Sequence, residues 1–165
     1  MPVFFKIIML SGAFSTALIA GLFYSYSCSV NIGLGRLTNE AYLRAMQQIN
    51  KAILNAWFFA SFMGTLLLLP VCSWILYDQQ GLSTAFYMIL TATLIYAIGV
   101  FGVTIFGNVP LNEALDRFDI GSASSTELKE RRGDFEQPWK RLHFIRTIAV
   151  LMSLLLTLTA LATCL

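Results

Sequence analysis

The stretch Phe106-Gly107-Asn108-Val109-Pro110-Leu111-Asn112 lies where a long apolar segment, residues 82–106, gives way to charged residues. Asn108 and Asn112 are four positions apart, so their amides share one face of a helix. Pro110 donates no backbone hydrogen bond, and its ring conflicts with the carbonyl four residues earlier. Irregular polar backbone at membrane depth is tolerated only where it is buried in protein or lines a wet cavity. We therefore predict that this stretch forms one wall of a polar pocket.

The composition of the chain indicates an integral membrane protein. Of its 165 residues, 57% are hydrophobic and 12% are charged, and the mean hydropathy is +0.70. A soluble domain averages about 25% charged residues, and a soluble core of this length could not bury so much apolar surface. The net charge of +2 and the lack of a basic run interleaved with aromatic residues argue against a nucleic-acid partner. The expected partners are membrane lipids and a hydrophobic or aromatic small molecule, with a homo-oligomer left open.

The charged residues divide the chain into four apolar spans. Residues 7–30, 52–76, 82–106 and 147–165 each reach the length of about 17–25 residues that a tilted helix needs to cross a bilayer. This pattern predicts an all-α fold, in which one domain forms an integral membrane four-helix bundle with helices extending into the cytoplasm.

Two details of the connections follow from the same pattern. Helical spacing continues without a break before Pro70, which predicts one helix over residues 40–76. Residues 113–137 are rich in Ser, Gly and mixed charge, and we expect them to form a cytoplasmic loop. Pro138 is then expected in the first turn of the fourth helix, where a missing donor costs nothing.

The distribution of lysine and arginine predicts the orientation. Ten of the 11 basic residues lie between the first and second spans or between the third and fourth, and only Lys6 lies on the other side. By the positive-inside rule, both of these connections are cytoplasmic and both termini are periplasmic or extracellular. We expect a protein of the bacterial inner membrane.

Polar side chains from all four spans gather near their cytoplasmic ends. Trp139, His143 and Arg146 recur at helical spacing and lie on one stripe of the fourth helix. Polar groups at membrane depth are costly and mark functional sites by default, so His143 and Arg146 are the candidate catalytic residues. The candidate substrate-binding residues are Tyr24, Asn31, Arg44, Gln48, Asn55, Asn108, Asn112 and Trp139.

Several of these residues also have a purely structural interpretation. Arg44 and Arg146 can extend toward lipid headgroups while their stems stay in apolar surroundings. Asn108 and Asn112 can satisfy the carbonyls that Pro110 leaves without a donor. Both interpretations stay open at the level of the sequence.

The metal-binding and redox residues are few. His143 is the only histidine, so no metal site is predicted and a bis-histidine haem within one chain is excluded, whereas a haem or metal shared between chains stays open. The imidazole could equally be a structural group at the membrane interface. Cys28, Cys72 and Cys164 show no metal-ligand spacing, and pairing of Cys72 with Cys164 in an oxidising compartment is left open.

Four stretches of this sequence together resemble a known family. The chain is similar over nearly its whole length to the anthrone-oxygenase-like family of small four-helix membrane proteins, most of which are uncharacterised. Relatives often carry Asn at the position of His143, so a catalytic base at this position is not a shared feature of the family. The stretches are Gly21-Leu22-Phe23-Tyr24, Arg44-Ala45-Met46-Gln47-Gln48-Ile49-Asn50, Asn108-Val109-Pro110-Leu111-Asn112, and Trp139 to Arg146 continuing into Thr147.

The resemblance implies oxygenation of a polycyclic phenolic anthrone to an anthraquinone without a conventional cofactor. A deprotonated anthrone reacts with oxygen directly, so the protein need supply only a base, stabilisation for an oxyanion, and exclusion of water. His143 would be the base, because an unperturbed imidazole titrates near neutrality. The oxyanion would be stabilised by Arg146, Asn108 and Asn112, and the rings would stack on Trp139 and Tyr24.

Two other classes of function compete with an oxygenase or oxidoreductase. The chain lacks the common nucleotide-binding and hydrolase motifs, which favours a non-enzymatic protein that binds a lipid or a quinone-like molecule, or that assists membrane assembly. A channel or transporter is less favoured, because no acidic residue lies within any span.

Overall fold

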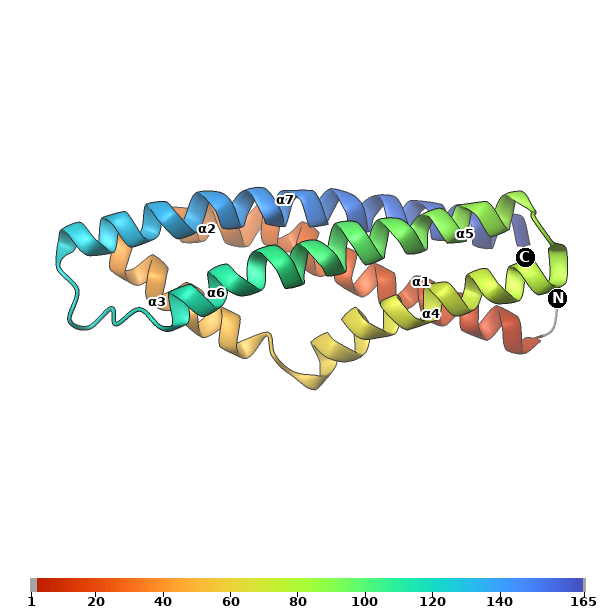
Figure 1. Cartoon of the computed structure of the whole chain (residues 1–165), viewed down its shortest axis with the longest axis horizontal. Helices are drawn as coiled ribbons and strands as arrows, with labels where there is room; N and C mark the ends of the chain where they lie inside the picture. Colours follow the sequence, from red (N-terminus) through yellow and green to blue (C-terminus); the bar gives the residue numbers. More distant parts are fainter. Residues whose placement is uncertain (1–2, 165) are drawn as a thin grey trace.

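The chain is all-α (Figure 1). The structure is a computed structural model that describes residues 3–164, and these form five continuous helical rods and no strand. Four of the rods are long and apolar enough to cross a membrane, which confirms the predicted membrane class. In chain order the rods are α1 (Val3–Ser25) with η1 (Tyr26–Val30) and α2 (Asn31–Gly35); α3 (Asn39–Ala52); α4 (Ala56–Gln80); α5 (Thr84–Ile95) with η2 (Tyr96–Gly102), η3 (Thr104–Asn108) and α6 (Val109–Asp116); and α7 (Ser125–Cys164), where η marks a π-helical segment.

The four predicted spans lie on the four long rods. The second span begins later than predicted, because residues 52–55 belong to the end of α3 and the linker after it. Position 165, the last residue of the predicted fourth span, lies outside the described residues.

The prediction of one helix over residues 40–76 is wrong. The chain breaks between Ala52 and Ala56, and this linker projects from the bundle in Figure 1. Asn55 is in an extended conformation, and its side-chain oxygen accepts a hydrogen bond from the Phe58 N–H at 3.0 Å. Its amide nitrogen donates to the Ala52 carbonyl at 2.8 Å. One side chain therefore satisfies both the end of α3 and the start of α4, which makes the break inexpensive.

The expected loop over residues 113–137 is also wrong, because only residues 117–124 connect α6 to α7. Ser124 and Glu127 form reciprocal hydrogen bonds at the start of α7: the Glu127 carboxylate accepts from the Ser124 N–H at 2.7 Å, and the Glu127 N–H donates to the Ser124 hydroxyl at 3.3 Å. This capping box starts the helix. Pro138 consequently lies inside α7 and not in its first turn. The carbonyl that it leaves without a donor belongs to Asp134, which is exposed.

The transmembrane half is a bundle in which α1 packs on α4 and α7, and α5 packs on the same two helices. Small residues allow close approach between rods. A Cβ atom added to Gly99 would lie 2.7 Å from the Ala149 Cβ, and one added to Gly64 would lie 3.5 Å from the Ser15 hydroxyl. Such contacts take the place of the hydrophobic effect, which does not drive helices together in lipid.

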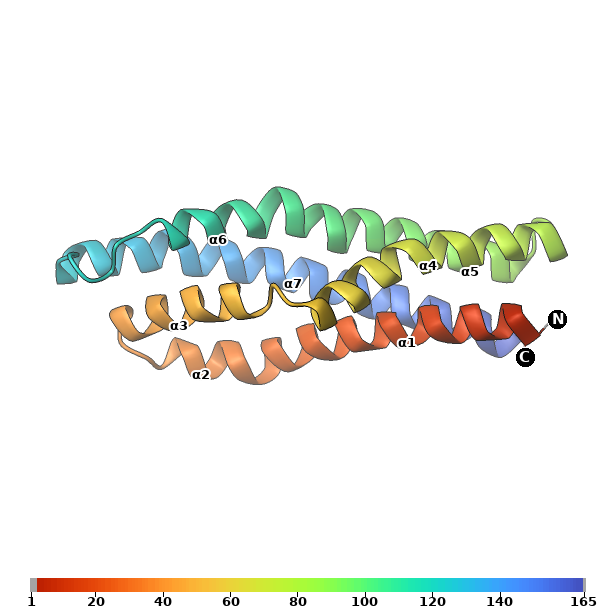
Figure 2. The same ribbon diagram turned by 90° about the horizontal axis from the view of Figure 1, so that it is seen from below.

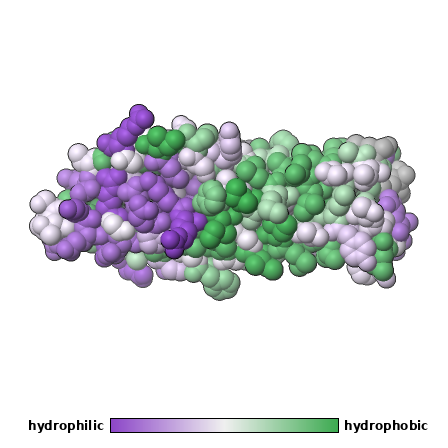
Figure 3. All heavy atoms as spheres, turned by 90° about the horizontal axis from the view of Figure 1, so that it is seen from above, coloured by the Kyte–Doolittle hydropathy of each residue, from purple (hydrophilic) through white to green (hydrophobic). Residues whose placement is uncertain are grey.

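The other half of the molecule is hydrophilic on its surface, as Figure 3 shows, and has its own core. Side chains of α3, α6 and the first part of α7 pack there, among them Leu43, Leu115 and Phe135. Arg132 of α7 donates to the carbonyls of Leu37 at 2.8 Å and Gly35 at 3.1 Å. These two hydrogen bonds hold the turn between α2 and α3 against α7, and they thereby position α3 beside the site described next.

Candidate functional site: a cationic pocket between the two halves

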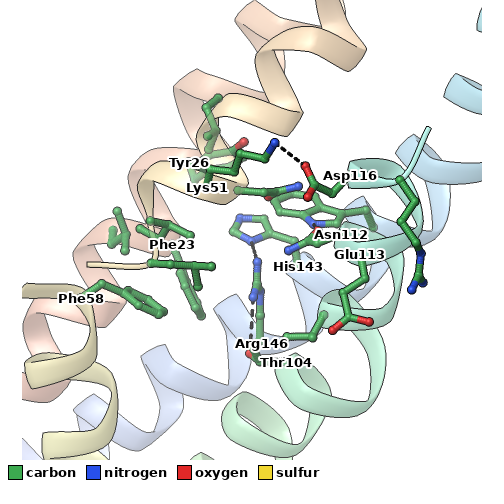
Figure 4. Close-up of a pocket in the computed structure, with 18 residues that line it drawn as sticks. Phe23, Tyr26, Lys51, Phe58, Thr104, Asn112, Glu113, Asp116, His143 and Arg146 are labelled. Atoms are coloured by element: carbon green, nitrogen blue, oxygen red, sulfur yellow. Dashed lines mark hydrogen bonds and ion pairs between the residues drawn. The ribbon is translucent and has the colours of Figure 1, made fainter. Parts of the chain in front are cut away.

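A pocket of about 380 Å³ lies where the apolar and hydrophilic halves meet (Figure 4). Its volume is in the range of about 300–1,000 Å³ that small-molecule sites occupy. All five rods contribute to the lining, which includes apolar side chains, a charged rim and a polar floor from α7. The floor consists of Trp139, His143 and Arg146, so the stripe predicted on the fourth helix does face a pocket.

His143 is enclosed by aromatic rings. Its imidazole stacks on the Trp139 ring, with centroids 5.0 Å apart and planes 13° apart. Phe23 and Tyr26 meet it edge-on at 5.5 and 5.3 Å. The ring is only 2% exposed, so its position is fixed by packing.

The hydrogen bonds of His143 define which nitrogen carries the proton. A guanidinium only donates, so the contact of 3.3 Å between Arg146 Nη2 and His143 Nδ1 makes Nδ1 the acceptor. A neutral ring then carries its proton on Nε2, which lies 3.0 Å from the Ser27 hydroxyl. Ser27 in turn donates to the Phe23 carbonyl at 3.0 Å. The basic nitrogen, Nδ1, is therefore the one that Arg146 covers.

Arg146 is a buried cation. It is 8% exposed, and no carboxylate within residues 3–164 forms an ion pair with it. Its Nη1 donates to the Thr104 hydroxyl at 3.3 Å, and its Nε is buried without a partner. The guanidinium lies 4.5 Å from the Phe23 ring centroid and 5.3 Å from that of Trp139. Burying such a charge costs several kcal/mol unless an anion pairs with it, so the site is suited to an anionic group.

The two amides of the 106–112 stretch both contact Trp139. Asn112 accepts from the indole N–H at 2.9 Å, and Asn108 donates to the Trp139 carbonyl at 3.4 Å. Asn112 lines the pocket, whereas Asn108 lies behind it with its side-chain oxygen buried and unpartnered. The irregular backbone expected near Pro110 is present as the π-helical turns of η3.

The rim of the pocket is charged. Lys51 of α3 and Asp116 of α6 form an ion pair at 2.7 Å, and Glu113 and Arg117 lie beside it. Both side chains of the pair are at least half exposed. Exposed pairs of this kind contribute at most about 1 kcal/mol, so this contact can open and close readily.

The structure brings together four of the ten predicted site residues in the pocket lining: Asn112, Trp139, His143 and Arg146. Asn108 supports Trp139 from behind. The remaining five are not in the lining: Tyr24 is 58% exposed, Asn31 is half-buried in α2, Arg44 pairs with Glu40, Gln48 is exposed, and Asn55 caps α4.

The aromatic wall formed by Phe23 and Tyr26 was not predicted from the sequence. The residue predicted on this rod, Tyr24, is 58% exposed. The structure shows that the inward face of this rod passes through Phe23, Tyr26 and Ser27, and that the π-helical turn of η1 begins at Tyr26. Phe23 and Ser27 are spaced at i and i+4, and this spacing is the signal in the sequence that could have identified the inward face of the rod.

Metal-ligating residues do not cluster within residues 3–164. All three cysteines are free thiols. Cys72 and Cys164 pack in the same apolar cluster at the end of the bundle away from the pocket, without a bond between them.

The fold and the pocket define the class of this protein: a four-span integral membrane protein with a pocket whose floor carries a buried guanidinium. A family model described as anthrone oxygenase matches residues 56–156, which is more than half of the chain. The chain belongs to the anthrone oxygenase family. No curated protein and no solved structure matches it. The matched region contains the polar floor, whereas Phe23, Tyr26 and Lys51 lie outside it.

Proposed function

We propose that this protein oxygenates a flat phenolic substrate of the anthrone type with molecular oxygen, within the pocket at the end of the transmembrane bundle. The observation that carries the proposal is the unpaired guanidinium of Arg146, buried among aromatic rings. The family supports the enolate chemistry, because oxidation of an anthrone passes through an enolate, whereas the assignment of His143 as the base rests on this chain's own pocket. A fixed positive charge in a water-poor site stabilises such an oxyanion far more than it would in water.

The first step is removal of a proton from the methylene carbon that lies opposite the anthrone carbonyl. The negative charge of the resulting enolate resides largely on the carbonyl oxygen. Arg146 moves from His143 Nδ1 to this oxygen, and Nδ1 takes the proton. Because the enolate oxygen neutralises Arg146, the imidazolium of His143 does not lie beside an unpaired positive charge.

Oxygen then reacts with the electron-rich carbon. One-electron transfer to O₂ and recombination form the C–O bond, and the peroxide takes its proton back from His143. His143 then removes the second C–H proton, the electron pair of that bond forms the new carbonyl as the O–O bond breaks, and the departing hydroxide takes the proton from His143 and leaves as water. The carbon is oxidised by four electrons and O₂ is reduced by four, so one O₂ is consumed and one water is formed for each quinone.

The stacked rings supply the shape of the site. Trp139 and His143 present parallel planes, and Tyr26 lies 5.4 Å from the Trp139 ring centroid. A flat polycyclic body matches such walls through offset or edge-on contacts. Asn112 fixes the indole through its hydrogen bond at 2.9 Å, which limits the tilt of the stacking surface.

The proposed orientation follows the positive-inside rule. The hydrophilic half, with α3 and the first part of α7, lies in the cytoplasm of a bacterial cell, and both termini lie on the opposite side of the inner membrane. The pocket is then at the level of the cytoplasmic leaflet surface.

The second candidate function is non-enzymatic binding of a lipid or quinone-like ligand. The same buried guanidinium and aromatic walls favour it, because they bind an anionic amphiphile whether or not oxygen reacts. Oxygen uptake separates the two functions.

The experiment uses the purified chain in lipid nanodiscs and a hydroxylated anthrone. Oxygen consumption and quinone absorbance are expected to rise together at a ratio of one, well above spontaneous oxidation. His143→Ala and His143→Asn are both expected to lower the rate by about 10²–10⁴-fold, because general-base catalysis contributes that much. Asn keeps an acceptor for Arg146 but is no base.

The controls make the outcome unambiguous. Arg44→Met removes a cation that is paired with Glu40 on the exposed face of α3, and it should leave the rate unchanged. If His143→Asn retains the full rate while His143→Ala loses it, the imidazole only positions Arg146, and the base assignment fails. If the unaltered protein binds the anthrone without faster oxygen uptake, the binding function is correct and the oxygenase is not.

A further inference from the structure

The exposed members of the pocket lining show where the pocket opens. The floor residues are buried, whereas Leu54 is 65% exposed and Glu113 is also exposed. Leu54 belongs to the linker between α3 and α4, and Glu113 belongs to α6. In Figure 2 the linker and α6 lie on different sides of the bundle axis, with α7 behind them. The pocket therefore opens on the flank of the bundle, between the linker and α6.

The two edges of this opening differ in polarity. On the side of the hydrophilic half lie the Lys51–Asp116 ion pair and Arg117. On the side of the apolar half lie Leu54 and Phe58; Trp57 of α4 and Phe106 of η3, 86% and 85% exposed, lie outside the lining on the rods that carry Phe58 and Val109. Exposed tryptophan is typical of the membrane–water interface, and lysine and arginine place their charges just outside it. This pattern is the one expected of an opening that lies in the interface plane and faces lipid.

We propose that the ligand enters this pocket sideways from the bilayer, past Leu54, and that it is an amphiphilic acid with a flat apolar body. This inference rests on the proposed function for the site, but it adds the route and the charge of the ligand. The apolar edge of the opening admits the rings. The acidic group, which takes the place of the enolate oxygen of the proposed reaction, meets Arg146, whose Nε is buried without a partner and whose charge pairs with no carboxylate within residues 3–164.

The arrangement of charges favours an acid over a neutral or cationic amphiphile. Lys51 and Arg117 lie at the opening and Arg146 lies on the floor, whereas the acidic lining residues are confined to the rim. Asp116 is already paired with Lys51. An anion moving inward thus leaves the lining carboxylates of Glu113 and Asp116 behind it and approaches the guanidinium of Arg146.

The test follows loading by fluorescence in the absence of oxygen. Trp57→Phe and Trp74→Phe leave Trp139, on the pocket floor, as the sole tryptophan. Anthraquinone-2-carboxylate dissolved in the nanodisc lipid is the probe, and its arrival quenches Trp139. Cys28→Ser and Cys164→Ser remove the two accessible thiols and leave the buried Cys72.

A bulky maleimide label then blocks either of two matched positions. Leu54 and Leu67 are almost equally exposed, at 65% and 63%, but only Leu54 lines the pocket. The label on the Leu54→Cys variant is expected to slow quenching by at least about tenfold, as expected when binding requires displacement of an obstacle. The label on the Leu67→Cys variant should leave the rate unchanged. Equal rates for the two labelled proteins would overturn the route.

Two further probes test the source and the charge of the ligand. Anthraquinone-2,6-disulfonate stays in water, and we expect it to quench far more slowly than the carboxylate; equally fast quenching would show that the pocket loads from water. The methyl ester of anthraquinone-2-carboxylate is expected to bind more weakly than the acid, and Arg146→Met should abolish the difference. Equal binding of ester and acid to unaltered protein would overturn the assignment of an acid.

Failure of this inference and failure of the oxygenase are distinguishable. Loading is measured without oxygen, and oxygen uptake is measured separately on the unlabelled chain. Oxygenation that persists while both labelled proteins load equally fast contradicts only the route. Loading that depends on Leu54 without any oxygenation supports the route and contradicts only the proposed reaction.

Discussion

Replacing Arg146 with methionine is expected to make the protein more stable while it abolishes function. The guanidinium is 8% exposed and has no carboxylate partner within the described residues. Desolvation of such a charge costs several kcal/mol. Methionine has a similar length and no charge, and it can fill the space between the Phe23 and Trp139 rings. The variant thus removes the penalty without opening a large cavity.

The magnitude follows from the contacts that are lost. Two hydrogen bonds, both 3.3 Å long, go to Thr104 and His143, and each contributes about 1 kcal/mol net. The contacts with the two aromatic faces contribute about 0.5–1 kcal/mol each. Thr104 keeps its bond to the Val100 carbonyl at 2.7 Å, so it is not left unsatisfied. These losses amount to about 3–4 kcal/mol, so a desolvation penalty of several kcal/mol leaves an expected net stabilisation on the order of 1 kcal/mol.

The assay is thermal unfolding in one detergent, followed by tryptophan fluorescence, with binding of anthraquinone-2-carboxylate measured on the same samples. Arg146→Met should unfold at a higher temperature than the unaltered chain and should lose the ligand-induced increase in stability. Arg44→Met is the control, because Arg44 is exposed and paired with Glu40, and its unfolding temperature should barely change. An Arg146→Met protein that unfolds at a lower temperature would show that the guanidinium is a structural group, and would refute the reasoning.

Two further predictions concern the helices that shape the pocket. Asn55→Ala removes the cap of α4, so it should destabilise the protein by about 1 kcal/mol in thermal unfolding and lower its affinity for the ligand. The control, Ser83→Ala, removes the cap of α5 and should give a similar loss of stability with unchanged ligand affinity. Equal effects of the two variants on ligand binding would contradict a role for the linker. Gly99→Ala places a Cβ atom 2.7 Å from that of Ala149 and should destabilise the bundle by about 1–3 kcal/mol through overpacking. The control, Gly21→Ala, has no atom within 4 Å of the added Cβ and should be neutral or stabilising. A neutral Gly99→Ala would show that η2 and α7 separate freely.

The membrane class and the four long helices follow from the sequence because hydrocarbon imposes a length and a composition on any segment that crosses it. Trp139, His143 and Arg146 were predicted to share a face because they lie on one uninterrupted helix, where the period of 3.6 residues holds. The same period misplaced Tyr24, beside a π-helical turn that changes the phase of the rod. It also missed the break at Asn55, because the apolar pattern continues on both sides of the linker.

Sequence alone determined that polar groups of several helices lie at one depth, because their distance along each span fixes their level in the bilayer. Only the tertiary structure decided which of them meet, since depth does not specify the rotation of a helix about its axis. That rotation turns Arg146 toward Phe23 and Thr104, where no carboxylate within residues 3–164 pairs with its charge.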